Sequence, residues 1–130
     1  MASDDLPEDA GDLPIPDSVL SGTADRTDVS IETLVDTLVV LDADLRGRHS
    51  AYEANYEYVT VDGTRAYLAD SEAWEAVVSE FDLNGDLESA ARRAHTESAT
   101  LLVDRSVENP QVAEDTVGIV VGVDTAEVMG

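Results

Sequence analysis

The two histidines of the chain, His49 and His95, are its first candidates for metal binding or acid-base catalysis. A helix would place His49 and Glu53 on one face, where they could ligate a metal ion or hold a general base. His95 belongs to a different predicted helix, and no pattern in the sequence brings it to the other two. The alternative is a hydrogen-bonded His95 at the edge of the core. We therefore predict no metal or other cofactor.

A second candidate is a calcium loop, because Asp82, Asn84 and Asp86 have oxygen-bearing side chains at its first, third and fifth positions. The sixth position holds Leu87 instead of glycine, and the twelfth holds Arg93 instead of glutamate. The end of one helix followed by the N-cap of the next explains the same residues. We favour that interpretation.

Arg92 and Arg93 are the candidates for contact with nucleic acid. They lie in the second of two predicted helices, residues 71–81 and 87–103, whose spacing around a glycine resembles a helix-turn-helix. In that arrangement Asp86 and Glu88 would occupy the first turn of the recognition helix and repel phosphate. An ordinary helical hairpin is therefore the favoured interpretation.

The four tyrosines cluster between positions 52 and 67, around an Asp62-Gly63 pair. That pair, between runs of β-branched and aromatic residues, predicts a hairpin with a two-residue turn. Side chains alternate between the two faces of a strand. One face of the hairpin is aliphatic and is expected to meet the core: Val59, Val61, Ala66 and Leu68. The other carries Tyr56, Tyr58, Thr60, Arg65 and Tyr67. We define the tyrosine face as Tyr56, Tyr58, Arg65 and Tyr67 of this side together with Tyr52 of the preceding helix.

The tyrosine face is the predicted interaction surface. Tyrosine supplies a large, rigid contact area with a polar tip, which suits protein interfaces. The alternative is that the helix before the hairpin covers this face within the same chain, Tyr52 and Tyr56 included.

Apolar periodicity places these candidates in a small α+β domain. Ser30 is the predicted N-cap of a helix that runs to about residue 55, with a kink or break near Gly47. The hairpin spans residues 56–69, two further helices follow, and residues 117–123 read as a buried strand. The predicted order is α-β-β-α-α-β, with a small antiparallel sheet packed against three helices. The glycines of the last strand, 118 and 122, are expected to let another element approach closely.

Two parts of the chain differ in composition. Residues 1–29 are acidic and contain three of the four prolines, so we predict a largely disordered segment in which residues 13–20 can dock on the domain. Residues 30–130 are predicted to form a single domain.

The charge balance is extreme: 29 aspartates and glutamates against seven basic residues, all of them arginine. A carboxylate-rich surface stays soluble in concentrated salt, where the Debye length is only about 3 Å at 1 M. In composition, and in stretches such as AYEANYEYVTVDGTRAYL, AARRAHTESA and GIVVGVDTAE, the chain resembles small uncharacterised acidic proteins of halophilic archaea. The resemblance implies a salt-rich habitat and no particular activity.

Function is expected to follow from the tyrosine face. The chain has no cysteine, no long apolar run and an acidic amino terminus, which indicates a cytoplasmic protein without a membrane partner. Strong acidity normally argues against nucleic acid, but in a halophile the whole proteome is acidic and the charge says little about partners. Nucleic acid is nevertheless disfavoured as a partner, because Asp86 and Glu88 would repel phosphate. We therefore expect a non-catalytic interaction or regulatory module that binds a protein partner or itself, as in a homodimer. A nucleic-acid-binding regulator that uses residues 71–103 is the alternative, followed by a metal-dependent enzyme.

Overall fold

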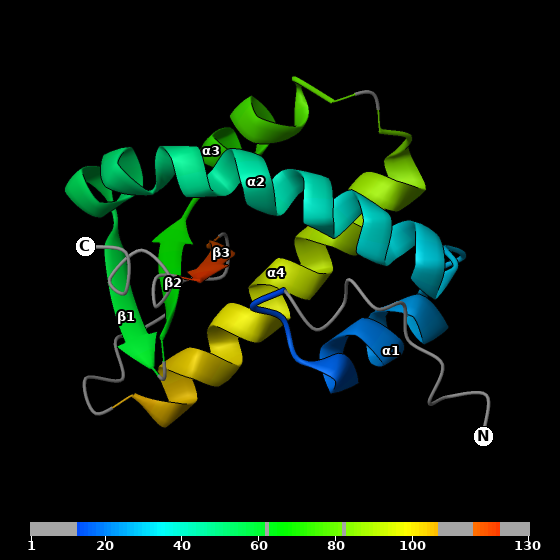
Figure 1. Ribbon diagram of the computed structural model, residues 1–130, viewed down its shortest axis with the longest axis horizontal. Helices are drawn as coiled ribbons and strands as arrows, with labels where there is room; N and C mark the ends of the chain where they lie inside the picture. Colours follow the sequence, from blue (N-terminus) through cyan, green and yellow to red (C-terminus); the bar gives the residue numbers. More distant parts are fainter. Residues whose placement is uncertain (1–12, 62, 82, 107–115, 123–130) are drawn as a thin grey trace.

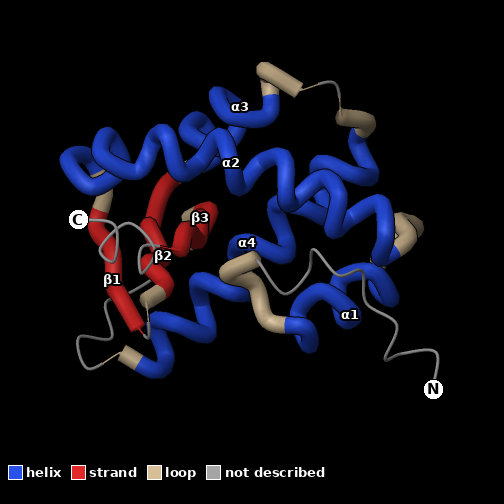
Figure 2. Tube along the Cα trace, viewed as in Figure 1, coloured by secondary structure: helices blue, strands red, loops and turns tan. Residues whose placement is uncertain are grey.

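The computed structural model describes residues 13–61, 63–81, 83–106 and 116–122. Its elements, in chain order, are α1 (Asp17–Arg26), α2 (Ile31–Asn55), β1 (Glu57–Val61), β2 (Thr64–Ala69), α3 (Ser71–Val78), α4 (Gly85–Arg105) and β3 (Val117–Gly122). The strands form one antiparallel sheet in the order β1-β2-β3 (Figures 1 and 2). The predicted α+β class is confirmed, and the order α-β-β-α-α-β holds from α2 onward.

The hairpin has the predicted register, with Val61 opposite Thr64 and Tyr58 opposite Tyr67. Gly63 has a φ of 81°, which glycine tolerates without steric cost and which a tight hairpin turn requires. Asp62, its predicted partner in the turn, lies outside the described residues. The last strand, β3, pairs with β2 and makes β2 the central strand.

Helix α2 begins as predicted, with the Thr33 N–H donating to the Ser30 side chain at 3.2 Å. Its inner stripe is fully buried and consists of Leu34, Val35, Leu38, Leu41 and Leu45. The helix runs without a break through Gly47, contrary to the predicted interruption. The ion pairs Arg46–Asp42 (3.0 Å) and Arg48–Asp44 (2.6 Å) stabilise the turns beside that glycine.

Helix α1 is a correction to the prediction of a largely disordered segment 1–29. Residues 1–12 lie outside the described residues, but residues 17–26 form a helix that begins directly after Pro16. Its buried side chains, Val19 and Leu20, and the preceding Ile15 all join the hydrophobic core. The predicted docking of this apolar stretch is thus realised, in a helix that packs against α2 and α4.

The boundary between α3 and α4 also differs from the prediction. Helix α3 ends at Val78, and Asn84 is not a helix stop but the N-cap of α4, accepting the Leu87 N–H at 2.8 Å. The small residues Ala90, Ala91 and Ala94 of α4 are fully buried. Leu101 is 44% exposed, whereas His95 and Ala99 are buried.

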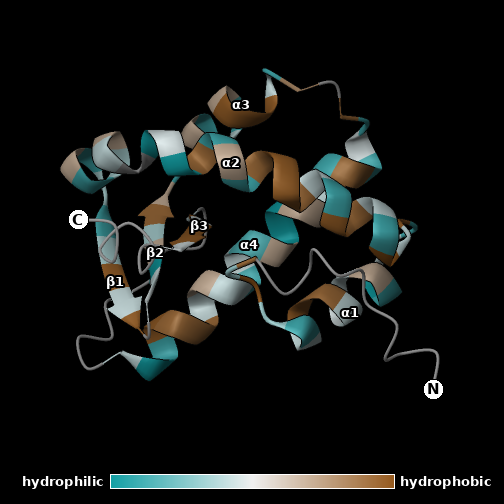
Figure 3. Ribbon diagram, viewed as in Figure 1, coloured by the Kyte–Doolittle hydropathy of each residue, from teal (hydrophilic) through white to brown (hydrophobic). Residues whose placement is uncertain are grey.

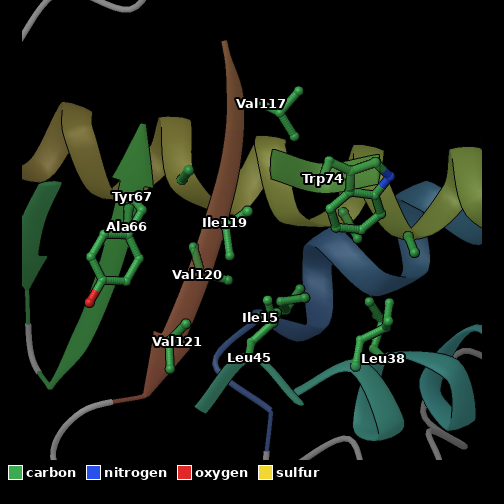
Figure 4. Close-up of a cluster of buried hydrophobic side chains, with 14 of the residues drawn as sticks. Ile15, Leu38, Leu45, Ala66, Tyr67, Trp74, Val117, Ile119, Val120 and Val121 are labelled. Atoms are coloured by element: carbon green, nitrogen blue, oxygen red, sulfur yellow. The ribbon is translucent and has the colours of Figure 1, made fainter. Parts of the chain in front are cut away.

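The sheet lies between two helices. The carboxyl-terminal end of α2 covers the tyrosine face, and α4 packs on the opposite face, where Val59 and Ala66 are buried (Figure 1). Hydrophobic and hydrophilic stretches alternate along both helices (Figure 3), as expected for elements with one buried side. The hydrophobic core gathers side chains from the sheet, from α2 (Leu38 and Leu45), from α3 (Trp74) and from Ile15 just before α1 (Figure 4).

Helix α4 approaches β3 unusually closely. A Cβ atom at Gly118 would lie 2.3 Å from the Ala99 Cβ, so only glycine fits there, as predicted. The backbone N–H groups of Gly118 and Val120 donate to the Thr96 Oγ1 and to the His95 Nδ1, each at 3.2 Å. In an antiparallel pair only alternate residues bond to the neighbouring strand, so α4 satisfies the edge of β3 that β2 does not use.

Candidate functional site

The tyrosine face forms one continuous cluster where the end of α2 meets the hairpin. The ring centroids of Tyr52 and Tyr67 are 5.4 Å apart, those of Tyr52 and Tyr56 are 6.0 Å apart, and those of Tyr58 and Tyr67 are 5.6 Å apart. All three contacts have tilted or edge-to-face geometry, each worth about 0.5–1.5 kcal/mol beyond the buried area. The structure therefore brings the four predicted tyrosines together.

The inner half of this cluster is core, which corrects the expectation of an outward-facing surface. Tyr67 is fully buried and Tyr52 is 7% exposed. The last turns of α2, which carry Tyr52, pack against the hairpin at Tyr67. The alternation of the hairpin predicted correctly that both faces exist, but it held no information about what covers each face. The alternative interpretation, coverage by the preceding helix, accounts for these two residues.

The outer half of the cluster reaches the surface at Tyr56 and Tyr58, both half-buried. The Arg65 guanidinium lies over the Tyr58 ring, 4.3 Å from its centroid, and its Nε donates to the Thr60 Oγ1 at 3.0 Å. Such a cation–π contact contributes about 0.5–2 kcal/mol, depending on its exposure. We call Tyr56, Tyr58, Thr60 and Arg65 the outer patch.

Glu53 anchors the outer patch, a role that the sequence reasoning missed. Its carboxylate lies 3.6 Å from the Arg65 guanidinium and accepts the Tyr58 hydroxyl at 3.5 Å. The sequence reasoning considered Glu53 only as a metal ligand. Its position one residue after Tyr52, on the turn of α2 that faces the hairpin, was the available signal.

The phenols of the buried half stay protonated near neutral pH. Burial raises the pKa of Tyr52 to about 12. Burial also raises the pKa of Tyr67, although its hydrogen bond to Arg65 and the charge of that residue oppose the shift. Neither hydroxyl is therefore suited to act as a base, and the cluster offers contact area rather than proton transfer.

Two of the three residues considered for metal binding, His95 and Glu53, have other partners. His95 is buried, its Nδ1 accepts the Val120 N–H, and its ring packs on Trp74 with centroids 5.6 Å apart. Burial lowers its pKa to about 4, so the imidazole is neutral and works as a structural acceptor. Glu53 belongs to the tyrosine cluster, and the side chain of His49 lies outside the described part of the structure. Among the described residues no three His, Asp or Glu side chains are grouped to hold a metal ion.

The calcium-loop interpretation depends on Asp82, which lies outside the described residues. The Asn84 side chain caps α4, so an N-cap does lie in this stretch, although the sequence placed the end of the preceding helix, and not the cap, at Asn84. Arg92 and Arg93 lie on the outer side of α4, where they line a groove of about 670 Å³. The first turn of that helix is acidic, as the sequence indicated, with Asp86 and Glu88. Glu88 accepts the Trp74 Nε1–H at 3.0 Å.

None of the helices in the described ranges is both long and apolar enough to cross a membrane.

Comparison with known proteins gives one result. No curated protein and no solved structure matches the chain significantly. A family model does match residues 13–123, which include every helix and strand of the described structure. The chain therefore belongs to the family described as a domain of unknown function, DUF8048.

Proposed function

We propose that this protein is a non-catalytic interaction module that binds a second copy of itself through the outer patch and the adjacent edge of β1. The observation that carries the proposal is the half-exposed Tyr58 with Arg65 stacked on it, next to a strand that pairs only with β2 among the described residues. Tyrosine and arginine are the residues most enriched at the energetic centres of protein interfaces.

The outer patch is pre-ordered for binding. Arg65 contacts Tyr58, Thr60 and Glu53, and the ring of the buried Tyr67 packs against the ring of Tyr58. Side chains that are already fixed lose little conformational entropy when a partner binds. The patch is therefore suited to a rigid contact.

A second copy is the partner that this edge fits best. An unpaired strand edge presents a row of N–H and C=O groups that another strand can complete. Two copies related by a two-fold axis would each present the same strand and the same patch, which gives a closed dimer. A carboxylate-rich protein works in this way only where salt screens its charge, and we propose a concentrated-salt cytoplasm as its setting.

The other two functions have less support. A nucleic-acid regulator that uses residues 71–103 would bring an acidic first turn to the phosphates. A metal-dependent enzyme would need His95 and Glu53 to leave their present partners.

Sedimentation velocity in molar KCl tests the proposal. The wild type should sediment as a dimer and Tyr58→Ser as a monomer with an unchanged circular dichroism spectrum. Val40→Ser is the matched control, because Val40 is 51% exposed on α2 and its removal should leave the dimer intact. A wild type that stays monomeric at high concentration, or a Tyr58→Ser protein that still dimerises, would contradict the proposal.

A further inference from the structure

Arg92 and Arg93 differ from four of the other five arginines of the chain in having no ion pair in the described structure. Four other arginines each lie within 4.0 Å of a carboxylate: Arg26, Arg46, Arg48 and Arg65. Among the described residues, Arg92 and Arg93 have no such ion pair, although the chain has 29 acidic residues. Two consecutive arginines that line one groove and have no carboxylate partner, in a protein of net charge −22, leave positive charge available to an anion from outside.

The two arginines line the groove on the outer side of α4, whose volume of about 670 Å³ is typical of small-molecule sites. Ser89, Arg93 and Thr96 follow one another at helical spacing along one wall, and Thr116, just before β3, contributes to the other. The groove also contains Leu101, which is 44% exposed, toward the end of the helix. Nine residues of helix separate Leu101 from Arg92, or about 13 Å at 1.5 Å per residue.

The donor set fits phosphate better than carboxylate. A phosphomonoester carries close to two negative charges and three strong acceptor oxygens, which two guanidiniums and neighbouring hydroxyls can satisfy together. Thr96 is prepared for this role, because its Oγ1 accepts the Gly118 N–H and its own hydrogen is left to donate. A carboxylate has only two oxygens and is satisfied by one guanidinium.

One acidic residue, Glu97, also lines the groove. Its carboxylate is paired with Arg26 of α1 at 3.1 Å, which offsets its repulsion toward an incoming anion. Asp86 and Glu88 lie at least one helical turn before Arg92, toward the start of α4. The Glu88 carboxylate accepts a hydrogen bond from the Trp74 indole. In molar salt the repulsion from these charges is confined to contact distance.

We propose that the outer groove of α4 binds a small organic phosphate. Arg92 and Arg93 hold the phosphate, with Thr96 as an additional donor, and Leu101 packs against the apolar part of the molecule. The groove is built by α4 and Thr116 and does not share residues with the outer patch, so the site is independent of the proposed dimer. A free inorganic phosphate would use the same arginines without the Leu101 contact.

Isothermal titration calorimetry of the full chain in molar potassium salt tests this site, with adenosine monophosphate, inorganic phosphate, adenosine and an oligothymidylate as probes. We expect millimolar or tighter binding of adenosine monophosphate, weaker binding of inorganic phosphate and none of adenosine. Arg92→Gln and Arg93→Gln should each weaken adenosine monophosphate about tenfold, as expected for the loss of one charge-assisted contact. Leu101→Ser should weaken adenosine monophosphate and leave inorganic phosphate unchanged.

Arg46→Gln is the matched control, because it removes one positive charge from α2 far along the chain from the groove and should leave binding unchanged. Melting curves of every variant establish that it is folded. Three results would each overturn the proposal: no binding of either phosphate compound, unchanged binding in both arginine variants, or binding of an oligothymidylate alone. The last would assign the arginines to nucleic acid.

Discussion

Replacing Gly118 with alanine tests the close contact between α4 and β3. The new Cβ would lie 2.3 Å from the Ala99 Cβ, about 1.5 Å short of the roughly 3.8 Å that two carbon atoms prefer. The Thr96 Cα at 3.3 Å and the His95 carbonyl at 3.5 Å leave no room to the side. Because Ala99 is fixed to the helix backbone, α4 itself would have to move.

The expected loss follows from two opposing effects. Alanine in a strand is about 0.5–1 kcal/mol more favourable than glycine, and overpacking a core costs about 1–3 kcal/mol or more. The displacement of a whole helix belongs at or above the upper end of that range. We therefore expect Gly118→Ala to lower the free energy of unfolding by about 2 kcal/mol and the Tm by roughly 8 °C in molar KCl.

A double-mutant cycle shows whether the cause is the contact with Ala99. Ala99→Gly alone should cost about 1 kcal/mol through helix propensity. The double variant should cost at least about 1 kcal/mol less than the sum of the two single variants, because the clashing atom is gone. Gly47→Ala is the control, since a Cβ there would meet nothing within 4 Å and should stabilise α2. Additive costs, or a stabilised Gly118→Ala protein, would refute the reasoning.

Three further predictions concern titration, a buried hydroxyl and salt. The pKa of His95 falls from an ordinary 6.5 to about 4 on folding, so its neutral form contributes stability that is complete above pH 6.5 and is lost as the pH falls toward 4. His95→Asn should lose this part of the pH dependence in a series of melting curves, and equal slopes for both proteins would argue against it. Tyr52→Phe removes a buried hydroxyl that has no hydrogen-bond partner among the described residues, and should leave the free energy of unfolding unchanged or raise it by up to about 1 kcal/mol. A loss above 1 kcal/mol in urea unfolding would indicate a partner. Dilution from molar to millimolar KCl should lower the Tm because the −22 charge repels itself; an unchanged Tm by circular dichroism would contradict this.

Local patterns predicted the parts of the fold that local chemistry controls. The Asp-Gly pair and its flanking strands gave the register of the hairpin, down to Tyr58 opposite Tyr67. Ser30 gave the start of α2, because a side-chain oxygen before an apolar stripe satisfies a free N–H of the first turn. These features need no information from distant residues.

The missed features depend on contacts between distant segments. Apolar periodicity alone does not show that Leu101 points outward, while α4 buries small residues where it approaches Gly118. Helix α1 has few apolar residues of its own and is stabilised by packing against α2 and α4. The sequence predicted which residues form the candidate site but not which of them are exposed. Tyr67 is buried because the end of α2 packs on it, and that contact joins segments that local patterns do not connect.

Side chains of α4 bind N–H groups at the edge of β3 that β2 does not use, and this has a consequence for assembly. With the N–H groups of Gly118 and Val120 already bonded to Thr96 and His95, a foreign chain finds no vacant donors at those positions of β3. If copies join through β1, each molecule offers one strand edge for pairing. In a dimer the two β1 edges are paired with each other, and no third copy can be added by the same contact. Such a protein reaches a fixed stoichiometry of two and does not polymerise into a ribbon, however strongly salt suppresses the repulsion between copies.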